Sequence, residues 1–435
     1  MKKQYNKPIY SILMMMMMVL SAASAQEVID LGANLEANSV SNDGNIVAGS
    51  IGDSNFIWTQ TEGLQIISTL TNGYPMAGRA TVSGDGTKIS ATITNPDTSL
   101  NEMGLYDIAT ETWTLLGGLA GSSDGSKSSA WAISEDGNVI GGLGWVNAGT
   151  AHGILWNETD GITDIGSTVA DRSTRINALS SDGNVAAGWQ DGTSGYRQGA
   201  IWVDGEQTLI FDQDGIEVGE AGAISGDGQW VVGGNAFEAY RWNAEEGLHY
   251  ISHPDSGMWF QGASTAISTN GSIIVGFYRP WPGPAVLGEG FIWTEETGRV
   301  ELNEYVTGLG IDDLGITFAL PLGISADGTN IVGLGRTNSG GLTGFLVKLP
   351  VAVSVNEVSL TSVDYYPNPV ADVLNISSEQ VIENIEVYTI DGQLLLSEDI
   401  RATQFKTDFS TYSTGTYFVK IVSGSNFKTF KVIKK

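Results

Sequence analysis

A four-residue motif, Ser-x-Asp/Asn-Gly, occurs seven times between apolar segments in the first 350 residues of the chain; an eighth match, at 122–125, lacks these segments. Its copies are SVSNDGNIVAG (39–49), TVSGDGTKISA (81–91), AISEDGNVIGG (132–142), ALSSDGNVAAG (178–188), AISGDGQWVVG (223–233), AISTNGSIIVG (266–276) and GISADGTNIVG (323–333). Asp-Gly and Asn-Gly adopt positive φ at low cost and are preferred at the centre of type I′ hairpin turns. Because apolar residues flank each copy, the motif predicts a strand, a tight turn and a second strand, with the serine hydrogen-bonded to the turn.

A third predicted strand follows each hairpin. These strands are FIWT (56–59), GLYD (104–107), GILWN (153–157), AIWV (200–203), YRWN (240–243), FIWT (291–294) and GFLVK (344–348). In most copies a short acidic turn and a fourth strand come next. Four-stranded units that repeat every 42 to 57 residues are typical of propeller blades, which bury their faces by stacking on one another. The sequence therefore predicts an all-β fold with a seven-bladed β-propeller over residues 26–350.

The seventh unit ends at its third strand and lacks a fourth. Residues 27–32, EVIDLG, have the pattern of the fourth strand ITDIG in another unit. We therefore expect this N-terminal segment to pair with the strand at 344–348 and close the ring. Such closure would leave no unpaired sheet edge.

The repeats are similar to the HAF-type extracellular repeat, in which Asp-Leu-Gly, Ser-x-Asp-Gly and a His-Ala-Phe-x-Trp segment recur. The best copy of the last segment is Ala151-His152-Gly153-Ile154-Leu155-Trp156, and most other units lack the histidine. The resemblance supports a β-repeat body over residues 27–348. It implies no enzymatic activity.

The first 25 residues have the composition of a Sec signal peptide. Lys2, Lys3 and Lys7 precede an apolar run from Ile9 to Leu20, and Ala23-Ser24-Ala25 supplies the small-residue cleavage pattern before Gln26. We expect cleavage after Ala25. No later stretch is long and apolar enough to span a bilayer, so no transmembrane segment is expected in the mature chain.

A second module is predicted at 364–435, after a linker at 351–363. Polar and apolar residues alternate through several short strands, Asp391-Gly392 is a hairpin signal, and Gly415 and Tyr417 open another strand. The pattern predicts a small β-sandwich.

Four residues at the start of this module, Tyr366, Pro367, Asn368 and Pro369, precede the hairpin, the STGTYFVKI strand and a basic end. Together they resemble the type A C-terminal sorting domain of the type IX secretion system of Bacteroidetes. The resemblance implies the type IX secretion machinery as a partner and passage across the outer membrane. It also implies later removal of the domain, so the protein would be secreted or attached to the outer cell surface. A small accessory binding domain is the alternative.

Composition excludes several functions. The net charge of −28 and the pI near 4.2 argue against nucleic acid as a partner, because binding it depends on Lys and Arg. With no cysteine and three scattered histidines, neither a metal centre nor a cofactor is expected. The turn chemistry already accounts for the repeated aspartates.

Loops between second and third strands, and between blades, should share one face of the propeller, called here the loop-rich face. Basic side chains expected there are Arg79, Lys127, Arg172, Arg175, Arg197, Arg279 and Arg336, and Trp131, Trp145, Trp189, Trp259 and Trp281 accompany them. Aromatic faces stack on sugars, and arginine binds carboxylates. The predicted ligand-binding residues are Trp145, Trp189, Arg197, Trp259, Tyr278, Arg279 and Trp281. The alternative is that these tryptophans only cap the ends of blades.

Another set of tryptophans recurs at one position of the third strand, and we expect it to pack between blades. Its members are Trp58, Trp156, Trp202, Trp242 and Trp293.

The favoured function is therefore a secreted, noncatalytic propeller that binds a glycan or protein ligand through the loop-rich face. The first alternative is a hydrolase or lyase acting on polysaccharide, since paired carboxylates can cleave glycosidic bonds. Its candidate carboxylates are Asp53, Asp97, Asp191, Glu238 and Glu289. No catalytic triad order or metal-ligand spacing supports that enzyme. The second alternative is a structural or adhesive surface protein.

Overall fold

The structure is a computed structural model that describes residues 26–71, 78–350, 363–389, 393–423 and 426–435. The chain divides between Pro350 and Val351 into two compact units. The signal peptide expected at 1–25 and most of the expected linker lie outside the described residues. No helix in the described ranges has the length and apolar character needed to span a bilayer.

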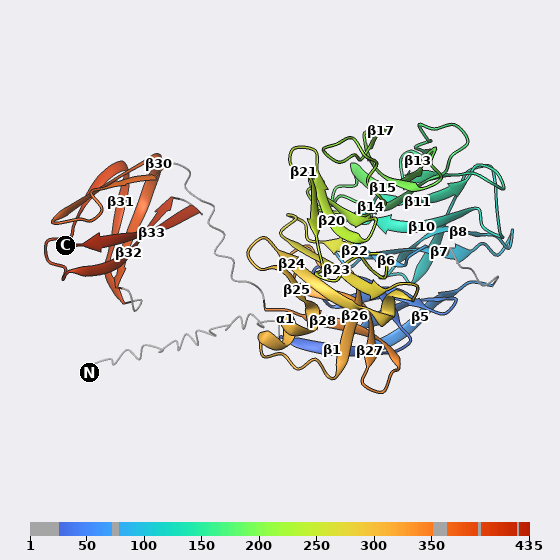
Figure 1. Cartoon of the computed structure of the whole chain (residues 1–435), viewed down its shortest axis with the longest axis horizontal. Helices are drawn as coiled ribbons and strands as arrows, with labels where there is room; N and C mark the ends of the chain where they lie inside the picture. The colour runs from blue at the N-terminus through green and yellow to red at the C-terminus, as the bar shows by residue number, and fades with distance from the viewer. Residues whose placement is uncertain (1–25, 72–77, 351–362, 390–392, 424–425) are drawn as a thin grey trace, which may run out of the picture. The chain divides into compact units, whose positions relative to one another are not determined.

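The first unit contains seven four-stranded antiparallel sheets, each a blade (Figure 1). Blade one contains β2 (Glu36–Val40), β3 (Ile46–Ile51), β4 (Ser54–Thr59) and β5 (Gly63–Thr69). Blade two contains β6 (Thr81–Val82), β7 (Lys88–Thr94), β8 (Asn101–Asp107) and β9 (Thr112–Gly117). Blade three contains β10 (Ser128–Ile133), β11 (Ile140–Trp145), β12 (Ala151–Asn157) and β13 (Gly161–Asp164). Blade four contains β14 (Thr174–Leu179), β15 (Val185–Asp191), β16 (Arg197–Val203) and β17 (Glu206–Leu209). Blade five contains β18 (Ala221–Ile224), β19 (Val231–Asn235), β20 (Glu238–Asn243) and β21 (Gly247–Ile251). Blade six contains β22 (Phe260–Ile267), β23 (Ile273–Pro280), β24 (Glu289–Thr294) and β25 (Gly298–Glu301). Blade seven combines β26 (Ile316–Ile324), β27 (Asn330–Thr337) and β28 (Leu342–Lys348) with β1 (Glu27–Ala33).

The seven-bladed propeller predicted from the repeats is confirmed. Within blades one to six the strands pair in chain order, and every predicted third strand is the third strand of its sheet. The first strands of the blades lie innermost and line the central channel, which contains a cavity of about 210 Å³.

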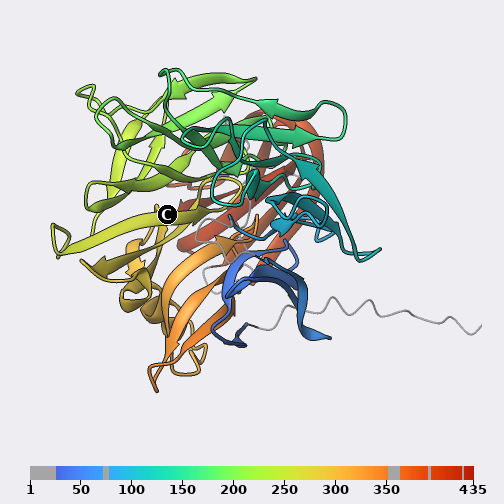
Figure 2. The same cartoon turned by 90° about the vertical axis from the view of Figure 1, so that its right-hand side faces the viewer.

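Closure by the N-terminal strand is also confirmed. β1 pairs antiparallel with β28 in a register from Glu27–Lys348 to Ala33–Thr343. In Figure 2 the blue N-terminal strands lie beside the orange last blade. Val28 and Leu31 of β1 are buried, so the strand completes a core as well as a sheet.

The motif turns form at the predicted positions, but their turn type differs from the predicted one. In the first copy the Gly44 N–H donates to the Ser41 carbonyl, and only the glycine has positive φ. The aspartate before it does not, so the turn is a type I turn followed by a left-handed glycine rather than type I′. The motif serine explains this choice. Its hydroxyl donates to the Asp or Asn side chain over 2.5–3.1 Å and accepts the backbone N–H five residues on, which holds the aspartate over the turn.

These turns also join neighbouring blades, a role that the sequence pattern does not predict. At six of the joints a backbone N–H of one motif donates to a carbonyl of the next over 2.8–3.1 Å. At the seventh, Ala326 N–H donates to the side chain of Asn42 over 3.2 Å. The repeated motif therefore forms a ring of hydrogen bonds around one end of the channel.

The motif aspartates predict a loss of stability in acid. Hydrogen bonds from Ser134 and Ser180 are the largest cause of the lowered pKa values of Asp136 and Asp182. Burial opposes the lowering at Asp43 and Asp85, but hydrogen bonds outweigh it. A lowered pKa stabilises the fold above the ordinary value of 3.8 and loses that contribution as the pH falls further.

We therefore expect the melting temperature to decrease when the pH is lowered below about 4. Asparagine occupies the aspartate position in the sixth copy, at Asn270, so Asp→Asn substitutions should preserve the turn. A variant with these four aspartates changed to asparagine should show a weaker acid dependence between pH 2.5 and 6. An unchanged pH profile would contradict this explanation.

The tryptophans of the third strands pack between blades as expected. Trp58 and Trp202 are buried, and Trp156, Trp242 and Trp293 are half-buried against core clusters. Two short helices were not predicted: η1 (Ala285–Leu287) between β23 and β24, and α1 (Leu302–Gly308) after β25. Leu302 and Val306 bury one face of α1.

The second unit is a separate β domain with its own core. Its strands are β29 (Val363–Tyr366), β30 (Val373–Thr389), β31 (Leu394–Asp408), β32 (Gly415–Ser423) and β33 (Asn426–Lys434). β30 pairs with β29 through its first half, with β32 through its second and with β31 along both, so the five strands are connected in one sheet.

Several sorting-motif residues have clear positions in this domain. The Asn368 side chain accepts from Ile433 N–H and donates to the Lys431 carbonyl, both over 2.9 Å, and so ties the motif to the last strand. Gly415 and Tyr417 open β32 as predicted. Asp391 and Gly392 lie outside the described residues, although β30 and β31 pair on either side of them.

Candidate functional site: an arginine–tryptophan ladder and an aromatic patch

Arginine and tryptophan side chains alternate across the loop-rich end of the central channel. The guanidinium of Arg175 lies 3.6 Å from the ring centre of Trp131 and 5.2 Å from that of Trp189. Arg79 lies 5.9 Å from Trp131 at one end, and Arg197 lies 4.0 Å from Trp189 at the other. We call these five residues, contributed by blades two to four, the ladder.

A bulge in the first strand of the blades turns one residue toward the channel. In β10 the register shifts between Ala130 and Ala132, which leaves Trp131 without a partner in the pairing. The same shift occurs at Asn38 in β2 and at Asn177 in β14, and all three residues line the channel cavity. Bulges redirect side chains in this way.

Glu220, just before β18, holds the outer half of the ladder. Its carboxylate accepts from Arg175 over 2.8 Å, from Arg197 over 3.1 Å and from the Asn177 amide over 2.9 Å. Arg197 and Glu220 also border a hollow of about 770 Å³ with exposed Tyr196 at its edge. One carboxylate therefore serves two guanidinium groups.

Two predicted ligand-binding residues are core residues, so the expectation that they are exposed was wrong. Trp189 is only 3% exposed, because it lies within β15 and its ring is flanked by arginines. Tyr278 lies within β23 and is fully buried; its hydroxyl is 2.8 Å from Glu238 and 2.7 Å from the Ile251 carbonyl. Burial raises the pKa of this phenol well above its usual range.

Trp145 occupies an intermediate position. It ends β11 and is half-buried, and its buried indole N–H has no hydrogen-bond partner among the described residues. This geometry favours packing at the end of the blade.

Of the other predicted residues, Arg197 belongs to the ladder, and Trp259, Arg279 and Trp281 form a group on blade six. Trp259 is 68% exposed and Trp281 is 44% exposed, and Trp281 N–H donates to the Trp259 carbonyl over 2.8 Å. The Arg279 guanidinium lies 4.6 Å from the ring centre of Trp281. With exposed Met258, these residues are called the aromatic patch. A hollow of about 320 Å³ next to Pro280 contains Glu289 and Glu301.

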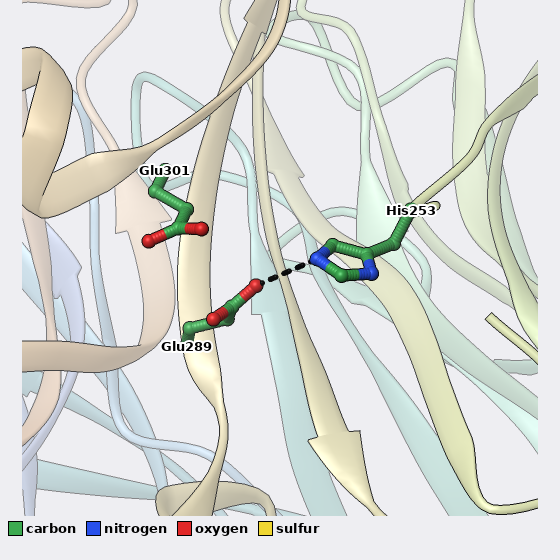
Figure 3. A group of neighbouring side chains, drawn as sticks. All are labelled: His253, Glu289 and Glu301. Carbon is green, nitrogen blue, oxygen red and sulfur yellow. Dashed lines mark ion pairs between the residues drawn. The ribbon is translucent and has the colours of Figure 1, made fainter. Parts of the chain in front are cut away.

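His253, Glu289 and Glu301 form a cluster beside the aromatic patch (Figure 3). Their potential ligand atoms all lie within 4.8 Å of one another, close enough to hold a metal ion. His253 Nε2 is 3.0 Å from a Glu289 oxygen. Burial is the main cause of the raised pKa of Glu289, and the negative charge of Glu301 adds to it.

The ring orientation of His253 favours a hydrogen bond over metal ligation. Its Nδ1 accepts the Asp255 N–H over 3.0 Å, so the proton of the neutral ring must be on Nε2. Nε2 is also the nitrogen that lies 3.0 Å from Glu289, and a nitrogen that carries a proton cannot bind a metal. Chemically, the cluster is a half-buried histidine–carboxylate pair next to an exposed glutamate.

Sequence reasoning did not assign Arg79, Trp131, Arg175 and Glu220 to a site. The sequence pattern places the first three on the loop-rich face, but they are not among the predicted ligand-binding residues. A usable signal existed, because Trp131 and Arg175 lie three and five residues before a motif serine. Their convergence depends on contacts between blades.

Comparisons with known proteins agree with the two-unit structure. Residues 364–435 match the family described as the secretion system C-terminal sorting domain. No curated protein matches the chain.

Several solved structures are similar at low identity. The β-propeller domain of the trilobed protease from Pyrococcus furiosus is 12% identical, with a TM-score of 0.48 over 73% of this chain and 94% of that one. TolB from Acinetobacter baumannii is 14% identical, with a TM-score of 0.39 over 62% of this chain and 63% of that one. PorZ, a surface component of the type IX secretion system of Porphyromonas gingivalis, is 13% identical, with a TM-score of 0.30 over 91% of this chain and 51% of that one. The chain thus covers less than two thirds of the TolB chain and about half of PorZ.

The fold and the C-terminal domain define a class: a β-propeller protein with a secretion sorting domain. The sorting domain implies secretion by the type IX system and attachment at the cell surface.

Proposed function

We propose that the protein is a noncatalytic binding propeller that is exported to the cell surface and holds a glycan or protein ligand on its loop-rich face. The carrying observation is the aromatic patch, where Trp259 and Trp281 are neighbours and expose much of their surface. Large exposed aromatics on hydrogen-bonded neighbouring segments mark binding sites more often than plain surface. The signal peptide and the HAF-type assignment belong to this proposal as predictions.

The patch suits a ligand with both apolar and polar surfaces. One face of Trp281 is next to Arg279, whose guanidinium donates to the Gly283 carbonyl and is thereby held in place. The indole rings can stack on sugar rings or apolar side chains. The neighbouring hollow adds carboxylates that can accept hydroxyl hydrogen bonds.

The test begins with a glycan and protein array probed with the purified protein. For a ligand found there, Trp259→Ala and Trp281→Ala should each weaken binding by about 1–3 kcal/mol, with little change in melting temperature. Tyr196→Ala is the matched control, because Tyr196 is an exposed aromatic on the same face in blade four. Loss of binding in Tyr196→Ala alone would move the site away from the patch.

One observation favours the alternative of a polysaccharide-cleaving enzyme. Glu289 has a raised pKa and lies beside Glu301, and such a pair can supply a general acid and a second carboxylate. Shortened products from any polysaccharide on the array, lost in Glu289→Gln, would replace the binding proposal with this one.

A further inference from the structure

We propose that the loop-rich end of the central channel is a binding site for an oxyanion, such as a carboxylate or sulfate group, with Arg79 as its anchor. The site uses the ladder and none of the aromatic patch. The test of this site is therefore independent of the test of the proposed function.

Arg79 differs from the other arginines of the ladder because its guanidinium pairs with no carboxylate among the described residues, and its only cation–π contact there is with the ring of Trp131. Among the described residues, no carboxylate lies within 4.0 Å of it, and it makes no side-chain hydrogen bond. It is half-buried and lines the channel cavity. Arg175 donates instead to Asn177 and Glu220, and Arg197 donates to Glu220.

The charges at this end of the channel do not balance at short range. Among the described residues of the ladder, only the guanidinium groups of Arg175 and Arg197 pair with a carboxylate, that of Glu220, whereas Glu36 and Glu220 act on Arg79 from farther away. Glu135, also on the channel wall, accepts from Asn42 at the motif end. A partly buried cation without a partner is costly. Burial lowers the pKa of Arg79 and that of Arg175, the latter to about 10. An arginine guanidinium stays protonated in proteins, so both groups carry a positive charge.

The size and polarity of the cavity define the ligand. A volume of about 210 Å³ admits a carboxylate or sulfate group but leaves the rest of a larger ligand outside. The guanidinium fork of arginine matches two oxygens of such a group. Asn38, 5% exposed, lines the same cavity, and its side-chain oxygen has no hydrogen-bond partner among the described residues. If the side-chain amide of Asn38 is flipped, so that its oxygen and nitrogen exchange positions, its N–H groups can donate to the anion.

The experiment is isothermal titration calorimetry of the purified protein at fixed ionic strength, with sodium sulfate, sodium glucuronate and neutral glucose as probes. Both anions should bind, and glucose should not. Arg79→Gln should weaken anion binding by about tenfold or more, as expected for loss of a charged hydrogen-bond donor. Tighter binding of glucuronate than of sulfate would identify an acidic sugar as the source of the oxyanion, and the reverse order would identify a free inorganic anion.

Arg241→Gln is the matched control. Arg241 also stacks between two tryptophans, Trp230 and Trp293, at 4.6 and 4.4 Å, but it pairs with Glu295 and does not line the cavity. It should leave anion binding unchanged. Arg79→Lys should give intermediate affinity, because it keeps the charge without the fork.

Three results would overturn the site. They are no anion binding by the unmodified protein, unchanged binding by Arg79→Gln, or an equal loss in Arg241→Gln. Because Arg79 makes no side-chain hydrogen bond to any residue that the structure describes, Arg79→Gln should melt as the unmodified protein does. Failure of the aromatic-patch variants would leave this titration unaffected.

Discussion

A chain that starts at Ala33 should be less stable than one that starts at Gln26 by about 3–6 kcal/mol. Its blade seven would lose β1, including the buried side chains of Val28 and Leu31, each contributing about 1.5–3 kcal/mol. The loss would also leave β28 as an unpaired edge. Chemical unfolding of both chains measures the difference, which is large against a usual total of about 5–15 kcal/mol.

Two further chains make this test specific. Removal of 364–435 should leave the unfolding of the propeller unchanged, because that domain is a separate compact unit. A synthetic peptide of residues 26–32, added to the shortened chain, should restore part of the lost stability. If the shortened chain unfolds at the same denaturant concentration, β1 does not close the ring in solution.

Trp202→Ala should destabilise the propeller by about 3–5 kcal/mol. The side chain is 1% exposed and packs in one core cluster with Leu179 and Ile176, so its removal leaves a large cavity. The indole N–H is buried without a hydrogen-bond partner among the described residues. Trp202→Phe should therefore cost much less, since it keeps most of the apolar volume and loses no hydrogen bond.

The same measurement separates core from surface tryptophans. Trp189→Ala should resemble Trp202→Ala, because Trp189 is also buried, whereas Trp281→Ala should stay within about 0.5 kcal/mol of the unmodified protein. Equal losses in Trp202→Ala and Trp281→Ala would contradict this assignment of burial.

Some of the structure was predictable because it is local and repeated. Each Ser-x-Asp-Gly copy contains the chemistry of its own turn, and seven copies at a blade-sized interval leave few alternatives to a propeller. The missing fourth strand of the last unit and the strand-like segment at 27–32 were likewise visible as complementary patterns. The turn type was missed because it depends on how the serine hydroxyl holds the aspartate, which composition alone does not show.

The candidate site was predicted only in part. Arg279 and Trp281 are close in sequence, and Trp259 lies in the connection that is hydrogen-bonded to theirs, so the structure brings these three predicted residues together. Trp189 and Tyr278 were misjudged because alternation within a strand does not reveal which neighbouring blade will cover a side chain. Only stacked blades decide that burial.

The sequence by itself determined the seven repeats, the closing strand and the sorting domain, since each depends on residues within one repeat or one motif. The tertiary structure alone decided the ladder. Arg79, Trp131, Arg175 and Glu220 come from four different blades, and they meet only because ring closure brings the first strands around one axis. Contacts of this kind depend on the angle and spacing between blades, which no single repeat encodes.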